Sequence, residues 1–129
     1  MNTSYKPHGY NSLSPYLICD HAQSLADLLK LIFDAEETRR FERTDGKIAH
    51  LELKIDDSIL MICDSTENYS ATKSMMHLYV PDVFSTFQKA MENGCEQIEA
   101  PINLHDDPDT RGSFYDTAGN YWAVSTPHK

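Results

Sequence analysis

Two histidines lie in segments that alternate like β-strands, and they are the first candidates for chemistry. His77 stands in the middle of SMMHLYV, and His50 is followed two positions later by Glu52 in IAHLELKI. Side chains two positions apart on a strand share a face, so His50 and Glu52 could form an acid/base pair. Together with His77 they could also supply three ligands to a divalent metal ion and leave one position open for a substrate.

Each of these roles has a plainer alternative. His77 could pack and hydrogen-bond within the wall of a cavity, or it could bind a ligand or transfer a proton without touching a metal. His50 and Glu52 could be one of the polar pairs that exposed strand faces carry routinely. Residue type alone therefore leaves a catalytic role open for these residues, and the sheet face that they occupy must decide.

Other residues that could do chemistry lack the sequence context for it. Cys19, Cys63 and Cys95 are widely spaced without a CxxC pair, which argues against a disulfide framework and a zinc ribbon and predicts reduced thiols in or near a core. No nucleophile elbow or phosphate-binding glycine-rich loop occurs. The segment HDDPDTR at 105–111 lacks EF-hand spacing, and we expect a solvated loop at a cavity mouth from which Arg111 could reach an anionic ligand.

The composition is that of one soluble globular domain. The chain has 129 residues, of which 40% are hydrophobic, and a net charge of −9. Such a charge disfavours nucleic acid as a partner and modestly favours a cationic ligand. No apolar run approaches the roughly 20 residues of a membrane span, and no secretory signal is visible, so the sequence predicts no membrane association and a cytoplasmic location.

The pattern of strands and helices occurs twice along the chain. LSPYLIC at 13–19 predicts a strand, and the next segment predicts a helix with Leu25, Leu28, Leu29 and Ile32 on its apolar stripe and Asp20 as a possible cap. Three strand-like segments follow, the first two joined by a hairpin at Asp45-Gly46, for which we expect a type I′ turn.

The second half repeats this order. A strand is expected at 74–80, and a helix follows with Asp82 as N-cap, Phe84, Phe87 and Met91 on one face and Gly94 at its end. Three more strand-like segments complete this half. Equivalent features of the two halves are separated by a nearly constant number of residues. The first strand starts at 13 and again at 74, the helix starts at about 22 and again at 82, and the last turn lies at 57 and again at 119. A repeat of this kind indicates two βαβββ units that close a core together.

Alternation along the strands separates an aliphatic face from a mixed one. Met76, Leu78 and Val80 oppose Met75, His77 and Tyr79, and Ala49, Leu51, Leu53 and Ile55 oppose His50, Glu52 and Lys54. We expect the helices to cover the aliphatic face. The mixed face is too aromatic for plain solvent and predicts a partly apolar small-molecule pocket. Its members include Tyr16, Met61, Met75, His77, Tyr79 and Tyr121.

These segments together resemble the vicinal oxygen chelate superfamily, which includes glyoxalase I, extradiol dioxygenases and the bleomycin resistance proteins. The likeness covers about residues 12–127 and is carried by SPYLICDHAQ, FDAEE, DGKIAHLELKIDDSILMICD, HLYVPDV and RGSFYDTAGNYWAVST in that order. It is strongest to the PhnB-like, glyoxalase/bleomycin-resistance-type group. The resemblance implies an α+β fold in a single domain, 1–129. Two βαβββ modules, about 12–65 and 73–127, form a curved mixed sheet around a cavity that a homodimer often completes.

The resemblance also implies where a metal would bind. Metal-dependent members use four side chains, usually His, Glu or Gln, and the corresponding positions here are Ser14, Met61, Met75 and Ala123. None of these is a usual ligand for a divalent ion, so we expect no metal and no cofactor.

The first functional hypothesis is therefore a non-metal module that sequesters or senses a small, aromatic or cationic molecule. The alternative is a metal-dependent lyase, isomerase or dioxygenase with a displaced site at His50, Glu52 and His77, which leaves enzymatic activity undecided. A purely structural role would show as a cavity filled by the protein's own side chains. The sequence does not say whether the modules pair within one chain or between two. The residues expected to line the cavity are Tyr16, His50, Met61, Met75, His77, Tyr79, Arg111, Tyr121 and Ala123.

Overall fold

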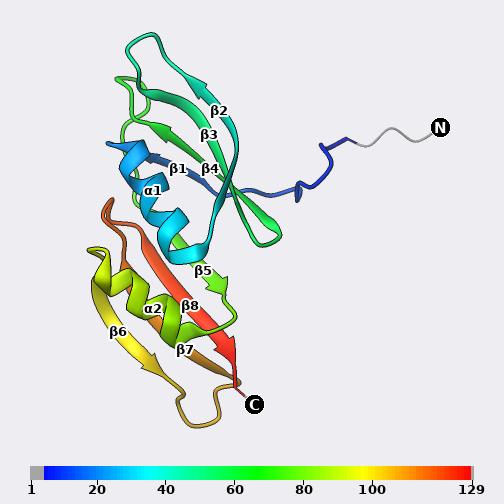
Figure 1. The fold of residues 1–129 in the computed structure, drawn as a ribbon, viewed down its shortest axis with the longest axis vertical. Helices are drawn as coiled ribbons and strands as arrows, with labels where there is room; N and C mark the ends of the chain where they lie inside the picture. The colour runs from blue at the N-terminus through cyan, green and yellow to red at the C-terminus, as the bar shows by residue number, and fades with distance from the viewer. Residues whose placement is uncertain (1–4, 129) are drawn as a thin grey trace, which may run out of the picture.

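The computed structural model describes residues 5–128, which form two consecutive βαβββ modules (Figure 1). The first module contains β1 (Tyr16–Cys19), α1 (Ala22–Phe33), β2 (Glu36–Glu42), β3 (Ile48–Ile55) and β4 (Ser58–Asp64). The second contains β5 (Met75–Tyr79), α2 (Val83–Glu92), β6 (Glu96–Ile102), β7 (Asp109–Tyr115) and β8 (Tyr121–Pro127). Within residues 5–128, no helix has the length and apolar character needed to cross a membrane.

Each module has its own four-stranded mixed sheet, with the orders β1-β4-β3-β2 and β5-β8-β7-β6. The first strand of each module pairs in parallel with the last, and the remaining pairs are antiparallel. The helix of each module connects its first strand to its second. Equivalent positions pair in both modules, with Tyr16 opposite Met61 and His77 opposite Ala123. The expected α+β fold of two βαβββ modules is confirmed.

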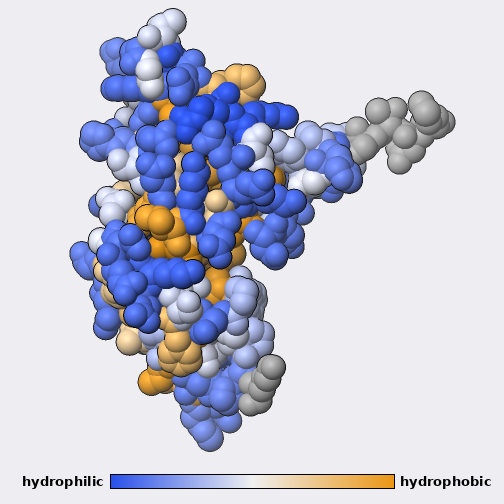
Figure 2. Space-filling view, viewed as in Figure 1, coloured by the Kyte–Doolittle hydropathy of each residue, from blue (hydrophilic) through white to orange (hydrophobic). Residues whose placement is uncertain are grey.

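One hydrophobic core spans both modules. The predicted stripe of α1 is buried, and α1 also contacts α2. Phe33 at the end of α1 packs on Phe114 and Trp122 of the second sheet, with ring centroids 6.4 and 4.8 Å apart. Figure 2 shows hydrophobic side chains gathered around the middle of the molecule, between hydrophilic ends. The two modules therefore bury their apolar side chains in one shared cluster.

The buried face of α2 differs from the one expected. Phe87 is buried, but Phe84 is 62% exposed and Met91 is only half-buried. Val83, Phe87 and Ala90 follow the spacing of four and three residues that places side chains on one helix face, and Phe84 is rotated away from it.

Only one of the two expected helix caps forms. The Asp82 carboxylate accepts hydrogen bonds from the backbone N–H of Phe84 and Ser85, at 3.1 and 3.3 Å. At α1, however, the N-cap is His21, whose side chain makes no capping bond, and Asp20 instead accepts a hydrogen bond from the Ser65 hydroxyl.

The first-turn N–H of α1 is satisfied from a distant strand. Asp64 on β4 accepts the N–H of Ala22 at 2.8 Å and that of Ile48 at 2.7 Å. A buried carboxylate 42 residues away therefore replaces the local cap.

The β2–β3 hairpin forms where expected but with another turn. The backbone N–H of Arg43 bonds to the carbonyl of Lys47 at 2.7 Å, which closes a loop of three residues between them. Gly46 has φ 85°, whereas Asp45 is not among the described residues with positive φ. A type I′ turn needs positive φ at both central residues, so that expectation was wrong.

A β-bulge follows the hairpin and reverses one assignment. The β2–β3 register moves from Phe41 opposite His50 to Glu42 opposite Ile48, which leaves Ala49 without a partner. Ile48 is consequently 2% exposed in the core, and Ala49 lines a pocket on the other face with Tyr16. Strict alternation had placed Ala49 on the aliphatic face.

Candidate functional site

The candidate site is the face of each sheet that points away from the helices, called here the open face. On the first sheet, Tyr16 of β1 and Glu52 of β3 both lie opposite Met61 of β4. On the second sheet, Tyr121 lies opposite Met75, and Ala123 lies opposite His77. The expected cavity residues are thus brought together within each sheet, in two groups that lie on separate sheets.

Large side chains remain exposed on both open faces. Tyr16 is 45% exposed, Met75 is 77% exposed and Tyr79 is 57% exposed. Met61, His50, Tyr121 and Arg111 are half-buried, and Ala123 is buried. A single exposed side chain of this kind is common, but several gathered on one face are typical of a surface that binds something.

A chain of hydrogen bonds crosses the first open face. The Tyr16 hydroxyl lies 3.0 Å from His50 Nδ1, and His50 Nε2 lies 2.7 Å from Glu52 Oε2. A carboxylate only accepts hydrogen bonds, so Nε2 carries the proton. In neutral His50, Nδ1 then accepts a hydrogen bond from the Tyr16 hydroxyl. His50 and Glu52 thus form the pair that their spacing predicted, and Tyr16 extends it. We call this set the Tyr16 relay.

Glu52 is a buried anion held by three neighbours. Burial alone would raise the pKa of this carboxyl, but hydrogen bonds from Tyr10 and His50 and the charge of Arg39 lower it below its usual value. The Arg39 guanidinium lies 3.9 Å from Glu52 and stands over the Tyr10 ring. Only 2% of the Glu52 side chain is exposed, so the carboxylate is enclosed although it belongs to an open face.

Two of these partners, Tyr10 and Arg39, were missed by the sequence analysis. Tyr10 precedes the first strand by six positions and meets Glu52 across 42 residues of sequence. Arg39 belongs to a segment that reads as an ordinary charged strand. Neither carried a local signal, because the Tyr10 contact depends on the path of the N-terminal segment over the sheet and the Arg39 contact depends on the register between β2 and β3.

Burial, followed by interactions with Cys63 and Glu52, raises the pKa of the Tyr16 hydroxyl. Tyr16 is therefore a neutral phenol at physiological pH. It also forms one wall of a pocket of about 430 Å³, which we call the Tyr16–Tyr69 pocket. The lining residues are Tyr16, Ile18, Arg43, Ala49, Cys63, Asp64, Thr66 and Tyr69.

The second open face has separate, shorter contacts. His77 Nε2 lies 3.0 Å from the Ser125 hydroxyl, and the His77 ring meets the edge of Tyr79 at a centroid distance of 4.9 Å. Tyr79 donates a hydrogen bond to Asp109 at 2.8 Å, which raises its pKa. Arg111 is ion-paired with Asp107 in the preceding loop, so a ligand anion would compete with this carboxylate.

The donors present do not fit a divalent metal ion. Ser14, Met61, Met75 and Ala123 offer no imidazole, carboxylate or thiolate at the four positions that the family resemblance points to. Both His50 ring nitrogens are engaged in hydrogen bonds. Across residues 5–128, no three His, Cys, Asp or Glu side chains are grouped so that they could hold a metal, and His50, Glu52 and His77 are accordingly not assembled into one.

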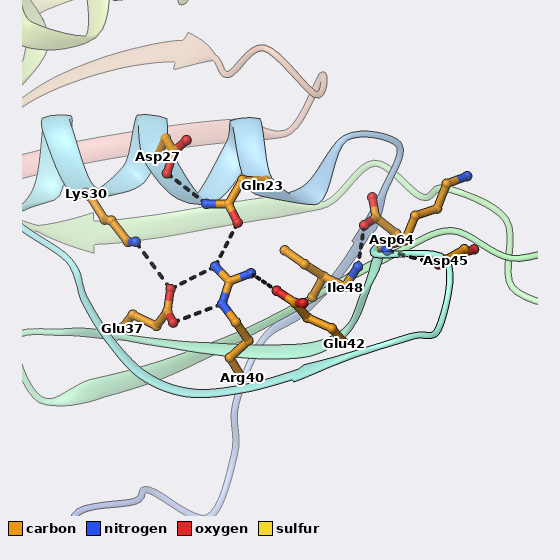
Figure 3. A network of polar contacts seen from close by, with 10 residues as sticks. Gln23, Asp27, Lys30, Glu37, Arg40, Glu42, Asp45, Ile48 and Asp64 are labelled. Carbon is orange, nitrogen blue, oxygen red and sulfur yellow. Dashed lines mark hydrogen bonds and ion pairs between the residues drawn. The ribbon is translucent and has the colours of Figure 1, made fainter.

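A second polar cluster joins α1 to β2 on the helix side (Figure 3). Arg40 donates to Glu37, Glu42 and Gln23, and Lys30 pairs with Glu37 at 3.3 Å. The Arg40 hydrogen bond is the main reason that the pKa of Glu37 falls to about 2. These groups satisfy one another, so the cluster is a structural link between helix and edge strand.

No protein-family model matches the sequence. Uncharacterized proteins of Mycobacterium bovis and Mycobacterium tuberculosis are 33% identical over an alignment that covers 90% of this chain and 83% and 74% of the respective relatives.

Three solved structures have a similar fold at low sequence identity. TioX from Micromonospora sp. ML1 superposes with a TM-score of 0.77 at 18% identity, covering 92% of this chain and 99% of TioX. A glyoxalase/bleomycin resistance protein/dioxygenase family enzyme from Burkholderia phytofirmans PsJN has a TM-score of 0.72 at 14% identity, covering 89% and 97%. TnmS3, an antibiotic binding protein from Streptomyces sp. CB03234, has a TM-score of 0.70 at 14% identity, covering 92% and 100%.

Proposed function

This chain belongs to the family of these mycobacterial proteins and has the fold of the glyoxalase/bleomycin resistance/dioxygenase superfamily, and from this premise we propose that it binds a small organic molecule on its open sheet faces without a metal ion. Sequestration or sensing is the role that such binding serves. Placement in the PhnB-like group is part of the proposal and rests on motifs such as DGKIAHLELKIDDSILMICD.

The observation that carries this proposal is the make-up of the open faces. Aromatic and thioether side chains lie exposed beside a small number of hydrogen-bonding groups, which is the usual composition of a small-molecule site. TnmS3 shares the fold and is an antibiotic binding protein, which adds support from outside the chain.

The metal-dependent alternative has less support. Its three proposed ligands are not grouped together, and His50 and Glu52 already bond to each other. Elemental analysis of tag-free protein after incubation with Mn, Fe, Co, Ni and Zn and desalting should find well below one equivalent of metal. Retention of about one equivalent would contradict this part of the proposal.

We also propose that a second copy of the chain completes the site. Arg39 and Lys54 lie on the first sheet. On the second sheet, Asp109 lies at the start of β7, and Asp107 in the loop before it is ion-paired with Arg111. If the first sheet of one copy packed against the second sheet of the other, the cationic side chains of the first sheet would face the carboxylates of the second. Such a pairing would cover Met75 and Tyr79.

The binding proposal is tested with a panel of aromatic and cationic compounds screened by the shift in melting temperature, followed by calorimetry. Met61→Ala and Tyr121→Ala should each weaken a hit about tenfold, since truncation removes apolar contact worth roughly 1–2 kcal/mol. Phe84→Ala is the matched control, because Phe84 is an equally exposed aromatic residue on α2. The proposal fails if no compound shifts the melting temperature, or if Phe84→Ala weakens binding as much as the other two.

A further inference from the structure

The Tyr16–Tyr69 pocket has the size and lining of a site for one aromatic ring system. Its volume of about 430 Å³ lies within the usual range for ligand pockets. Tyr16, Ile18, Ala49 and Tyr69 give it apolar walls, and the bulge in β3 is what presents Ala49 there. No side chain of the second sheet lines it, so this pocket is built by one module.

The Tyr16 hydroxyl stands where this pocket meets the relay. Tyr16 interacts with Cys63, which is also a wall of the pocket, and with His50 on the other side. When the Tyr16 hydroxyl donates a hydrogen bond to His50 Nδ1, the phenol oxygen keeps lone pairs that can accept a hydrogen bond from a ligand. Glu52 fixes the orientation of the His50 ring, which is the arrangement of an activated hydroxyl with its base and orienting acid.

One cationic side chain lines this pocket, although the net charge of the whole chain is negative. The Arg43 guanidinium lines the pocket and donates long hydrogen bonds of 3.4 Å to the carbonyls of Asp64 and Ser65. It is also ion-paired at 3.7 Å with Asp45, a carboxylate that is 56% exposed, so a ligand anion would compete with Asp45 for Arg43. Both oxygens of the Asp64 carboxylate accept backbone N–H groups, at 2.8 and 2.7 Å, which compensates its charge. The ionisable groups that face the pocket or the relay are Tyr10, Tyr16, Arg39, Arg43, His50, Glu52, Cys63, Asp64 and Tyr69.

We propose that the Tyr16–Tyr69 pocket binds a planar aromatic compound with an acidic hydroxyl group, and that the Tyr16 relay takes the hydroxyl proton. The ligand O–H proton moves to the Tyr16 oxygen while the Tyr16 proton moves to His50 Nδ1. The ligand becomes an oxyanion beside Arg43, and His50 becomes an imidazolium held against Glu52. This inference rests on the proposed function and names the ligand class for the first open face.

The test uses 7-hydroxy-4-methylcoumarin and its 7-methoxy analogue, which has the same ring system without the acidic proton. The neutral and anionic forms of the hydroxycoumarin absorb at different wavelengths, so the absorption spectrum reports the protonation state of the bound probe. At one pH unit below the pKa of the free probe, about a tenth of it is anionic in solution. Bound to the wild-type protein, more than half should be anionic.

Tyr16→Phe should abolish the excess of anion and weaken hydroxycoumarin binding about tenfold, because one hydrogen bond to a developing charge is lost. Binding of the methoxy analogue should change less than about twofold. Glu52→Gln and His50→Gln should also lower the anionic fraction and spare the methoxy analogue, which a merely structural role would not do. Tyr5→Phe is the matched control, because this phenol is exposed and lies outside both sheets.

The outcomes separate the two proposals. If both probes bind but the anionic fraction is the same in wild-type protein and Tyr16→Phe, the proton relay is overturned and small-molecule binding stands. If neither probe binds the wild-type protein, this pocket assignment is overturned, and the binding proposal is then judged by the compound panel described above. An excess of anion that disappears only with the relay variants is the expected result.

Discussion

At the scale of single residues, several acidic side chains that look chemically suggestive serve the fold. Asp116 is buried and accepts hydrogen bonds from the backbone of Ala118 and Asn120 and from Trp122 Nε1, at 2.8, 3.0 and 2.8 Å. Asp64 has a similar role in the first module. Buried carboxylates whose two oxygens both accept backbone hydrogen bonds, or that cap a turn, are poor candidates for catalysis. Glu52 differs, because its hydrogen-bond partners lead to an exposed phenol.

The lowered pKa of Glu37 predicts that the free energy of unfolding depends on pH. Its pKa of about 2 in the folded protein, lowered first of all by Arg40, lies below the usual value for an unfolded chain. Stabilisation by this group is therefore present above about pH 4.5 and is lost as the pH falls toward 2. In urea unfolding, Glu37→Gln should lower the free energy of unfolding by about 1 kcal/mol at pH 7, since the ion pair is partly solvated. The difference from wild type should disappear near pH 2.

Glu36→Gln is the matched control for this measurement. Glu36 is the exposed neighbour of Glu37, and it has no ion pair among the described residues. Its substitution should leave stability within about 0.5 kcal/mol at either pH. If both substitutions lowered the free energy of unfolding equally, the stabilisation could not be assigned to the ion pair between Arg40 and Glu37.

At the scale of secondary structure elements, the two helices begin by different devices. Asp82→Ala should destabilise the protein by about 1 kcal/mol in urea unfolding, because it removes the N-cap of α2. Asp20→Ala should cost less than half of this, because Asp20 bonds to Ser65 and the first-turn N–H of α1 is taken by Asp64. The assignment of the two caps is wrong if Asp20→Ala is the more damaging substitution.

The β3 bulge shapes the Tyr16–Tyr69 pocket as well as the strand register. It moves Ile48 into the core and Ala49 to the Tyr16–Tyr69 pocket, so a uniform strand would place a different side chain at the pocket wall. The pocket therefore depends on an irregular element, as binding sites often do.

At the scale of the whole molecule, the helices share one core and leave both open faces uncovered. Met75→Glu should convert a dimer into monomers in sedimentation velocity, raising the dissociation constant at least about tenfold, because a carboxylate would have to be desolvated at the interface. The monomer itself should keep its melting temperature, since Met75 is 77% exposed.

Phe84→Glu is the control for the oligomeric state, because it puts the same charge on the exposed side of α2. It should leave the sedimentation coefficient unchanged. A wild-type protein that sediments as a monomer at micromolar concentration would refute the second-copy proposal.

The sequence by itself determined the duplicated βαβββ order, the buried stripe of α1, the cap at Asp82 and the pairing of His50 with Glu52. Each of these depends on periodicity or on neighbours within a few positions, which a linear pattern records.

Tertiary structure alone decided the rest. Asp64 replaced Asp20 at α1, the bulge turned Ala49 to the other face, Tyr10 enclosed Glu52, and Tyr16 joined the relay. Apart from the bulge, these contacts join residues 34–42 positions apart, and they form because the sheet brings distant strands and the N-terminal segment together. Hydrogen bonds form between groups that lie close together in the folded protein, and the local sequence does not show which distant residues are close in space.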